Sequence, residues 1–374
     1  MSVEETIARL RANDSMKWVN YPGEIGAWVA EMDFGVAPKI RQGLLDAVDK
    51  GLFGYISAQM DENLRSTTAK WLGHRFGWEV ASTDVMRISD VLHGLTIMMD
   101  RFVEPGPVIV PTPAYMPFMW MPQKWHREAI HVPMQFSDGW HFDLDGIDAA
   151  FARGAKILVL CNPYNPLGAV FSAEELAAVG EVVERHGGQV FADEIHAPLT
   201  LFGNRHTPYA SVNAVNAGHS LTAIAASKGW NIAGLRCAQL VLTNDRYRKL
   251  AEDWAFEVKD GASILGTIAT IGAYQSEDWL DSVISKLEAN VSILEDALAN
   301  VLVKVRYHRP QATYLVWLDF RDYGVDDLVE RIHAAGVAVT DGAACGRPGF
   351  VRLNLATEPD VLEEALRRIA GVVA

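Results

Sequence analysis

Residues 220–236 read SLTAIAASKGWNIAGLR, and this stretch indicates both a fold class and a site. Its first part, SLTAIA (220–225), is apolar on both faces, which is typical of a strand covered by helices on each side of a sheet. Comparable runs are PVIVP (107–111), KILVLC (156–161), QVFAD (189–193) and CAQLVLT (237–243). Helical stretches separate them, as in LAAVGEVVERHGG after the capping box SAEE (172–175). The alternation predicts an α/β fold with a mostly parallel central sheet and helices on both faces.

The C-terminal part of the chain predicts a second, smaller α/β unit. We expect a long helix at about 281–302, a strand at 313–320, a helix at 326–335, a strand around 349–355 and a closing helix from Pro359. At the N-terminus, an irregular arm leads into a helix at about 38–49. We therefore predict three segments, which are an N-terminal arm and helix that pack with the small domain (1–44), a large domain (45–275) and a small C-terminal domain (276–374).

The composition excludes several classes of partner. The 374 residues carry 33 Lys and Arg against 47 Asp and Glu, a net charge of −14, so neither nucleic acid nor an anionic membrane surface is an expected partner. Three cysteines without a CxxC spacing indicate a reducing cytosol rather than a disulfide framework or a zinc site. The first residues, MSVEETIARL, contain no apolar signal core, and the longest uncharged run (105–123) is interrupted by prolines. We expect a soluble, cytoplasmic protein.

Several common catalytic motifs do not occur in the sequence. HExxH, GxSxG, GxGxxG and GxxxxGK[ST] are absent, so a zinc protease, a serine hydrolase, a dinucleotide-binding protein and a P-loop NTPase lack support. Polar residues instead follow the ends of the predicted strands, where open α/β sheets bind ligands. These residues are Tyr115 after 107–111, Asn165 after 156–161, Asp193 and His196 at the end of 189–193, and Lys228 after 220–225.

Lys228 is the clearest candidate for chemistry. Between residues 221 and 242, only Lys228 and Arg236 carry charge. A lysine held out of water loses its proton more readily and becomes a nucleophile that can form a Schiff base with an aldehyde. Asp193 would hold a cationic ring nitrogen protonated, and the guanidinium fork of Arg352 would suit a carboxylate. Each residue also has an ordinary explanation, as a solvated lysine, a helix-capping aspartate or a surface arginine.

The candidates, taken in chain order, resemble the fold-type I family of pyridoxal 5′-phosphate (PLP)-dependent, aminotransferase-like enzymes. The residues in that order are Tyr55, Tyr115, Asn165, Asp193, Lys228, Arg236 and Arg352. The eight-residue step from Lys228 to Arg236 is similar to the family's lysine-to-phosphate-arginine signature. WVAEMDF (28–34), FGY (53–55), DEIH (193–196) and SKGWN (227–231) resemble its cystathionine β-lyase, or C–S lyase, branch. The resemblance runs from about residue 17 to the end and implies the fold-type I architecture.

The resemblance implies a role for each matching residue toward the cofactor. Lys228 would form the covalent link to PLP and shuttle protons, and Asp193 would pair with the pyridine nitrogen. Tyr115 would stack on the ring, while Asn165 and His196 would lie near its phenolic oxygen. Lys228, Asp193 and Tyr115 would thus be the catalytic residues.

The resemblance also implies how the phosphate and the substrate would be held. The expected phosphate ligands are Arg236, Ser227 and the backbone N–H groups of Val91 and Leu92 at the start of a helix. Tyr55 would reach the phosphate in the other subunit, which implies a homodimer with active sites at the subunit interface. Arg352 would bind the α-carboxylate of a small amino-acid substrate.

Three positions bear on this resemblance. Asp90 stands where the wider superfamily usually has a small residue, and its carboxylate would repel phosphate unless it turned away, for instance to cap the helix. Ala225 replaces a hydroxyl that often helps to bind phosphate. His196 stands where classical aminotransferases have a tyrosine, which favours the C–S lyase branch.

The implied activity is cleavage of L-cystathionine, or of cysteine S-conjugates, by β-elimination to a thiol such as homocysteine, pyruvate and ammonia. This would place the protein in amino-acid metabolism, in methionine biosynthesis. Two alternatives remain open. One is a PLP-dependent aminotransferase of class I/II, because the α-proton step is shared. The other is a PLP-bound regulatory protein that acts through a partner.

Overall fold

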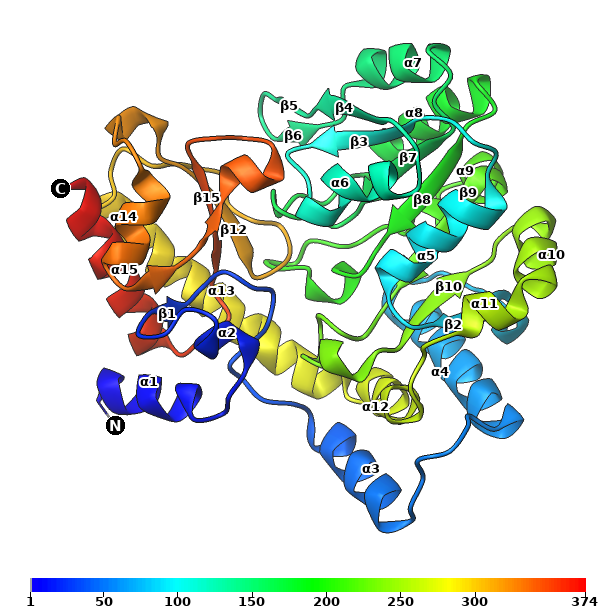
Figure 1. Cartoon of the computed structure of the whole chain (residues 1–374), viewed down its shortest axis with the longest axis horizontal. Coiled ribbons are helices and arrows are strands. Elements are labelled where there is room, and N and C mark those ends of the chain that lie inside the picture. The colour runs from blue at the N-terminus through cyan, green and yellow to red at the C-terminus, as the bar shows by residue number, and fades with distance from the viewer. Residues whose placement is uncertain (1) are drawn as a thin grey trace.

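The five predicted apolar runs form five strands of a seven-stranded sheet in the computed structural model of the chain, which describes residues 2–374 (Figure 1). In spatial order the strands are β2 (Val85–Ile88), β10 (Ala238–Val241), β9 (Ser220–Ile224), β8 (Gln189–Asp193), β7 (Ile157–Cys161), β3 (Val108–Thr112) and β4 (Ala129–Pro133). β10 runs antiparallel to both of its neighbours, and the pairs from β9 to β4 are parallel. The predicted α/β fold with a mostly parallel sheet is confirmed.

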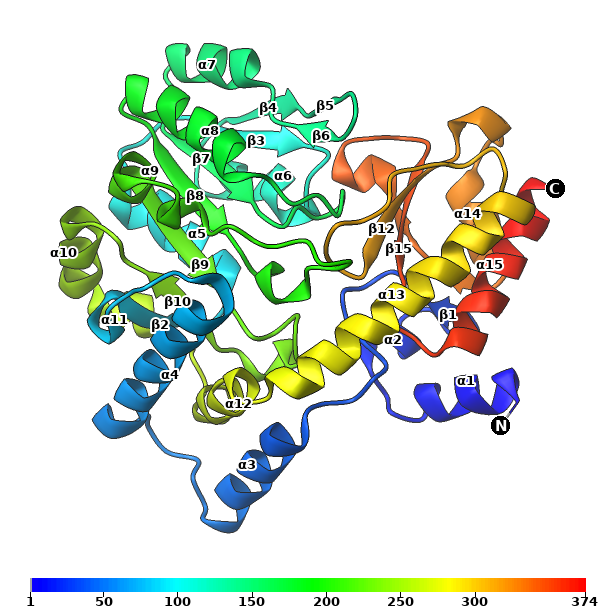
Figure 2. The ribbon, with the colours of Figure 1, turned by 180° about the vertical axis from the view of Figure 1, so that it is seen from behind.

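Helices cover both faces of this sheet (Figures 1 and 2). One face carries α5 (Val91–Ile97), which continues as the π-helical turn η2 (Met98–Phe102), together with α6 (Met116–Lys124), α10 (Asp245–Asp253) and α11 (Ala255–Lys259). The other face carries α7 (Leu144–Ala152), α8 (Ala173–Arg185) and α9 (Ala214–His219). The predicted capping box at the start of α8 is present, with reciprocal bonds between Ser172 and Glu175.

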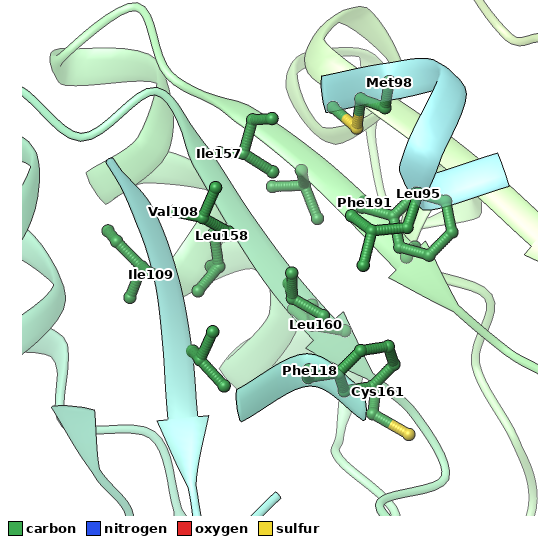
Figure 3. Packing of buried hydrophobic residues seen from close by; sticks show 14 of the residues in the cluster. Leu95, Met98, Val108, Ile109, Phe118, Ile157, Leu158, Leu160, Cys161 and Phe191 are labelled. Carbon is green, nitrogen blue, oxygen red and sulfur yellow. The ribbon is translucent and has the colours of Figure 1, made fainter. Parts of the chain in front are cut away.

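The core between α5 and the sheet brings the start of α5 close to the strand ends. Figure 3 shows Leu95 and Phe191 within the buried cluster that joins the helix to the strands. A Cβ at Gly94 would lie 3.0 Å from a methyl group of Leu240 and 3.2 Å from one of Ile88, so glycine permits this close approach. α5 is therefore packed closely against β2, β8 and β10.

A second sheet lies in the C-terminal part of the chain. Its antiparallel strands are, in spatial order, β11 (Arg306–Tyr307), β12 (Leu315–Asp319), β15 (Phe350–Asn354) and β14 (Thr340–Asp341). The helices around it are α13 (Glu277–Asn300), α14 (Leu328–Ala334) and α15 (Pro359–Val373). α13 runs along the back of the molecule from the larger sheet to the smaller one (Figure 2). The predicted small α/β unit is thus observed, with two additional short strands.

The N-terminal segment lies along this smaller unit before the chain turns away. α1 (Val3–Arg11) packs on α15, and β1 (Ile25–Gly26) pairs with β13 (Val337–Ala338); α2 (Met16–Val19) lies between α1 and β1. α3 (Pro38–Asp49) then projects from the body and packs on α12 (Ile264–Tyr274), and α4 (Ala58–Phe76) follows (Figure 1). The division of the chain at residues 44 and 275 stays a prediction.

The remaining described elements are short. A small hairpin joins β5 (Gln135–Phe136) to β6 (Trp140–His141), and 3-10 turns fill several of the loops. Across residues 2–374, every helix is too short or too polar to cross a bilayer. The cytoplasmic location stays a prediction.

Candidate active site

A cavity of about 390 Å³ opens at the carboxyl ends of β7, β8 and β9. It collects ten of the eleven side chains and backbone positions expected from the sequence. The ten are Val91, Leu92, Tyr115, Asn165, Asp193, His196, Ser227, Lys228, Arg236 and Arg352. Tyr55 does not line it, because it lies on the segment after α3 with its side chain fully exposed.

Lys228 follows β9, and its side chain enters the cavity, where it loses its proton more readily than a surface lysine does. Its Nζ donates a hydrogen bond to the carbonyl oxygen of Ala30 at 3.1 Å. Desolvation in the cavity, together with the nearby charge of Arg352, lowers its pKa to about 8. The amine is therefore far more nucleophilic near neutral pH than an ordinary surface lysine.

Asp193 is the last residue of β8 and lies level with Cys161 of β7 and Ala223 of β9 in the strand register. Its side chain is buried, and Oδ1 accepts a hydrogen bond from the backbone N–H of Ile195 at 3.0 Å. Burial raises its pKa to about 7, an effect that Lys228 only partly offsets. A cationic group placed beside Asp193 would restore its ionised form.

His196 stays neutral beside these two residues. Burial and the positive charges of Lys228 and Arg352 lower its pKa to about 3. Its Nδ1 is buried and has no hydrogen-bond partner within residues 2–374. A buried ring nitrogen without a partner is costly in a protein interior, so this atom is available to a ligand.

Arg352 reaches the cavity from β15 of the smaller sheet. Its Nη1 donates to Oδ1 of Asn165 at 3.1 Å, and its Nη2 donates to the carbonyl of Trp28 at 3.0 Å and to Oγ1 of Thr340 at 3.2 Å. All of these acceptors are neutral, and Nε has no partner in the described chain. A buried guanidinium without a carboxylate favours an anionic ligand.

Asp90 and Arg236 face each other at the start of α5. Asp90 Oδ1 caps the helix by accepting the N–H of His93 at 2.9 Å, while its Oδ2 pairs with Nη2 of Arg236 at 2.7 Å. Ser227 and Val91 line the same cavity as this pair. Asp90 therefore caps the helix, which was one of the roles considered for it from the sequence, and it also forms an ion pair with Arg236.

Residues of the N-terminal segment form one side of the cavity, although none of them was among the expected site residues. Met16, Trp28, Val29 and Ala30 all line the cavity. The sequence contained a signal for three of these four residues, because Trp28, Val29 and Ala30 belong to WVAEMDF (28–34), which resembles the C–S lyase branch. Other lining residues that were not expected include Ser89, Met116, Cys161 and Ile195, and of these Cys161 ends a predicted strand.

This side of the cavity is fixed by buried polar contacts. The ammonium group of Lys17 pairs with Asp33 at 2.8 Å and donates to the carbonyl of Ala356 at 3.0 Å, with both charged side chains buried. Asn231, three residues after Lys228, donates to the carbonyl of Met32 at 2.8 Å and accepts its N–H at 2.9 Å. These contacts connect the N-terminal segment to the small unit through Ala356 and to the loop that contains Lys228 through Asn231.

A family model described as aminotransferase class I and II matches residues 29–369, most of the chain. The chain belongs to the aminotransferase class I and II family. A cystathionine β-lyase from Corynebacterium glutamicum is 37% identical over 98% of this chain and 99% of its own. The cystathionine β-lyase PatB from Bacillus subtilis is 33% identical over 93% and 92%. The prediction of the family and of its C–S lyase branch is confirmed.

A solved structure supports the same family at the level of the fold. It comes from Corynebacterium diphtheriae and was presented as that of a candidate PLP-dependent β-cystathionase. It superposes with a TM-score of 0.91 at 37% identity and covers 100% of this chain and 98% of its own. PLP is the cofactor of this family.

The residues of the cavity fit PLP. The cofactor carries an aldehyde, a basic ring nitrogen, a phenolic oxygen and a phosphate. The cavity offers a desolvated amine at Lys228, a buried carboxylate at Asp193, an unpaired ring nitrogen at His196 and a guanidinium at Arg236. Each group of the cofactor thus has a chemically matched side chain, and Arg352 is left for an anionic substrate group.

Proposed function

We propose that this chain is a PLP-dependent C–S β-lyase that cleaves L-cystathionine, or related cysteine S-conjugates, to a thiol, pyruvate and ammonia. One observation carries the proposal: a single cavity unites the low-pKa amine of Lys228, the buried carboxylate of Asp193 and the carboxylate-free guanidinium of Arg352. Relatives that carry the name cystathionine β-lyase over nearly their full length support the choice of reaction.

Nine cavity residues hold the cofactor in this proposal. Lys228 forms the covalent link, Asp193 pairs with the ring nitrogen, and Tyr115 packs on the ring. Asn165 and His196 lie at the phenolic oxygen. The phosphate ligands are Arg236, Ser227 and the backbone N–H groups of Val91 and Leu92.

The side chains of the cavity then divide the work of elimination. When bound, PLP supplies an electron sink for the charge that develops at the substrate Cα. Lys228 Nζ, released when the amine of the substrate takes its place, would accept the α-proton, because its lowered pKa leaves more of the amine unprotonated near neutral pH. Asp193, ionised beside the ring nitrogen, keeps that nitrogen cationic. The Cβ–S bond breaks with its electron pair on sulfur, the thiolate takes a proton, and water completes the release of pyruvate and ammonia.

Arg352 orients the substrate for this step. Its guanidinium is buried and held by Asn165, Trp28 and Thr340, so its position is fixed before a ligand arrives. A bidentate contact with the α-carboxylate fixes the amino acid relative to Lys228. Preorganisation of this kind lowers the entropy cost of reaching the reactive geometry.

The functional unit that we propose is a homodimer. Tyr55 is fully exposed, and the neighbouring Phe53 and the α3 residue Val48 expose 64% and 53% of their surface. Apolar side chains on a projecting segment are typical of a surface that packs on another copy of the chain. In this arrangement the Tyr55 hydroxyl reaches the phosphate of the partner's cofactor.

Incubation with cystathionine tests the proposed reaction. Purified, PLP-loaded protein with cystathionine and no keto acid is expected to release pyruvate and a free thiol, measured by lactate dehydrogenase coupling and a thiol reagent. Lys228→Ala is expected to reduce the rate by at least about 100-fold, since it removes the proton acceptor. Lys249→Ala, an exposed lysine outside the cavity, serves as the matched control. Turnover that requires an added keto acid would instead establish an aminotransferase.

A further inference from the structure

The phosphate end of the cavity contains a carboxylate that is already bound to its arginine. Asp90 Oδ2 lies 2.7 Å from Nη2 of Arg236, and Oδ1 is held by the N–H of His93. The Ser89 hydroxyl lies 3.4 Å from Oδ2 and can donate to it. The carboxylate is thus fixed in place by a helix cap and directed at the guanidinium.

The backbone fixes Arg236 in the same way. It adopts a left-handed conformation, with φ of 54°, which is unfavourable for a residue with a Cβ atom. Its carbonyl accepts the N–H of Ser263 at 3.0 Å, and the Ser263 hydroxyl donates to the carbonyl of Leu235 at 2.6 Å. These bonds fix the backbone of Arg236 at the start of α12, and the ion pair with Asp90 positions its side chain, which is 58% exposed.

Few other cations are free to neutralise a phosphate here. Among the charged residues that line the cavity in the described chain, the proposed function assigns Lys228 to the cofactor aldehyde and Arg352 to the substrate carboxylate. Ala225 offers no hydroxyl. Arg236 is therefore the main cation for the phosphate, and Asp90 competes for it.

We propose that Asp90 is an internal competitor of the cofactor phosphate for Arg236 and thereby sets the affinity of the chain for PLP. The inference rests on the proposed function, because it concerns the same cofactor. Binding of a phosphate dianion requires the guanidinium to be shared, and it places two anions at short range, which costs free energy. Removal of the Asp90 charge eliminates both penalties.

The test compares ligands with and without phosphate. Cofactor-free full-length chain is titrated with PLP and with pyridoxal, and binding is followed through tryptophan fluorescence, since Trp28 lines the cavity. Asp90→Asn keeps a helix-capping oxygen but loses the charge. We expect this variant to bind PLP at least about threefold more tightly, the range of a partly exposed ion pair, and to bind pyridoxal as wild type does. Inorganic phosphate is expected to compete with PLP more strongly in the variant.

Two further variants make the result decisive. Asp90→Ser is a second neutral capping residue and is expected to behave as Asp90→Asn does. Asp84→Asn removes the same charge from a pair with Arg248, outside the cavity lining, and is expected to leave PLP affinity unchanged. Unchanged or weaker PLP binding in both Asp90 variants would overturn the inference. Failure of the wild-type chain to bind PLP at all would overturn the proposed function instead.

Discussion

At the scale of single residues, desolvation acts on the two central groups in opposite directions. It lowers the pKa of Lys228 to about 8 and raises that of Asp193 to about 7, so both move toward the neutral form. A neutral amine is useful for capture of an aldehyde. An uncharged carboxyl is of no use to a cationic ring nitrogen, so Asp193 becomes effective only when the cofactor supplies the opposite charge.

Asp193 is therefore expected to cost stability in the cofactor-free chain. The folded state holds its proton up to about pH 7, whereas the unfolded state loses it near 3.8, so this carboxyl lowers the free energy of unfolding as pH rises between these values. Asp193→Asn is expected to stabilise the cofactor-free chain at pH 8, by at most about 4 kcal/mol, while it abolishes lyase activity.

Urea unfolding of both proteins without cofactor measures this effect. The increase in the free energy of unfolding caused by Asp193→Asn should be smaller at pH 5.5, because Asp193 of the folded wild-type chain is already protonated there. An equal loss of stability at both pH values would show that the carboxylate is not held in an unfavourable environment.

The sequence alone identified the charged candidate residues but not the ion pair between Asp90 and Arg236. Lys228 and Arg236 stood out because they are the only charges in a long apolar stretch. The contact between Asp90 and Arg236 could not be predicted, because it depends on a left-handed backbone at Arg236 and on the seating of α5 at Gly94.

At the scale of elements, fully buried strands were predicted well. Strands β7, β8 and β9 start or end within one residue of the predicted runs, since continuous apolar stretches with polar residues at their ends leave little ambiguity. β2 and β4 were missed. β4 alternates buried and exposed residues, and β2 contains Arg87, whose charge is paired with Asp61 of α4. β2 has only four residues and includes a charge, and β4 includes a polar residue, so neither contains the unbroken apolar run that identified the other strands.

Helices, like strands, were predicted only where the local sequence carries a clear signal. α15 begins at Pro359 as predicted, because proline suits a first helical turn. α4 was not predicted, since its buried face includes Thr68 among few apolar residues. The antiparallel direction of β10 was also not predictable, because a parallel and an antiparallel neighbour bury the same side chains.

At the scale of the whole molecule, the site exists only where distant segments meet. Arg352 of the small sheet contacts Asn165 of the large unit and the Trp28 carbonyl of the N-terminal segment. Chain order and family resemblance placed these residues on one list. Their mutual distances follow from how the two sheets and the N-terminal segment pack, which no local pattern specifies.

The proposed homodimer makes a prediction at this scale. Sedimentation is expected to give twice the mass of one chain. Tyr55→Phe should remain dimeric and bind PLP about tenfold more weakly, since a hydrogen bond to a charged group contributes about 1.5–3 kcal/mol. Tyr323→Phe, a tyrosine of the small unit, is the control. A monomer, or a Tyr55→Phe dimer with wild-type PLP affinity, would contradict the shared site.

The central claim is that Lys228 carries the cofactor, and reduction followed by peptide mapping tests it most directly. PLP-loaded chain is treated with borohydride, digested and analysed by mass spectrometry. If Lys228 carries the cofactor, a phosphopyridoxyl group is found on the peptide that contains Lys228, and none is found there in Lys228→Arg. A phosphopyridoxyl group on a different lysine, or on no peptide of a fully loaded wild-type chain, would contradict it.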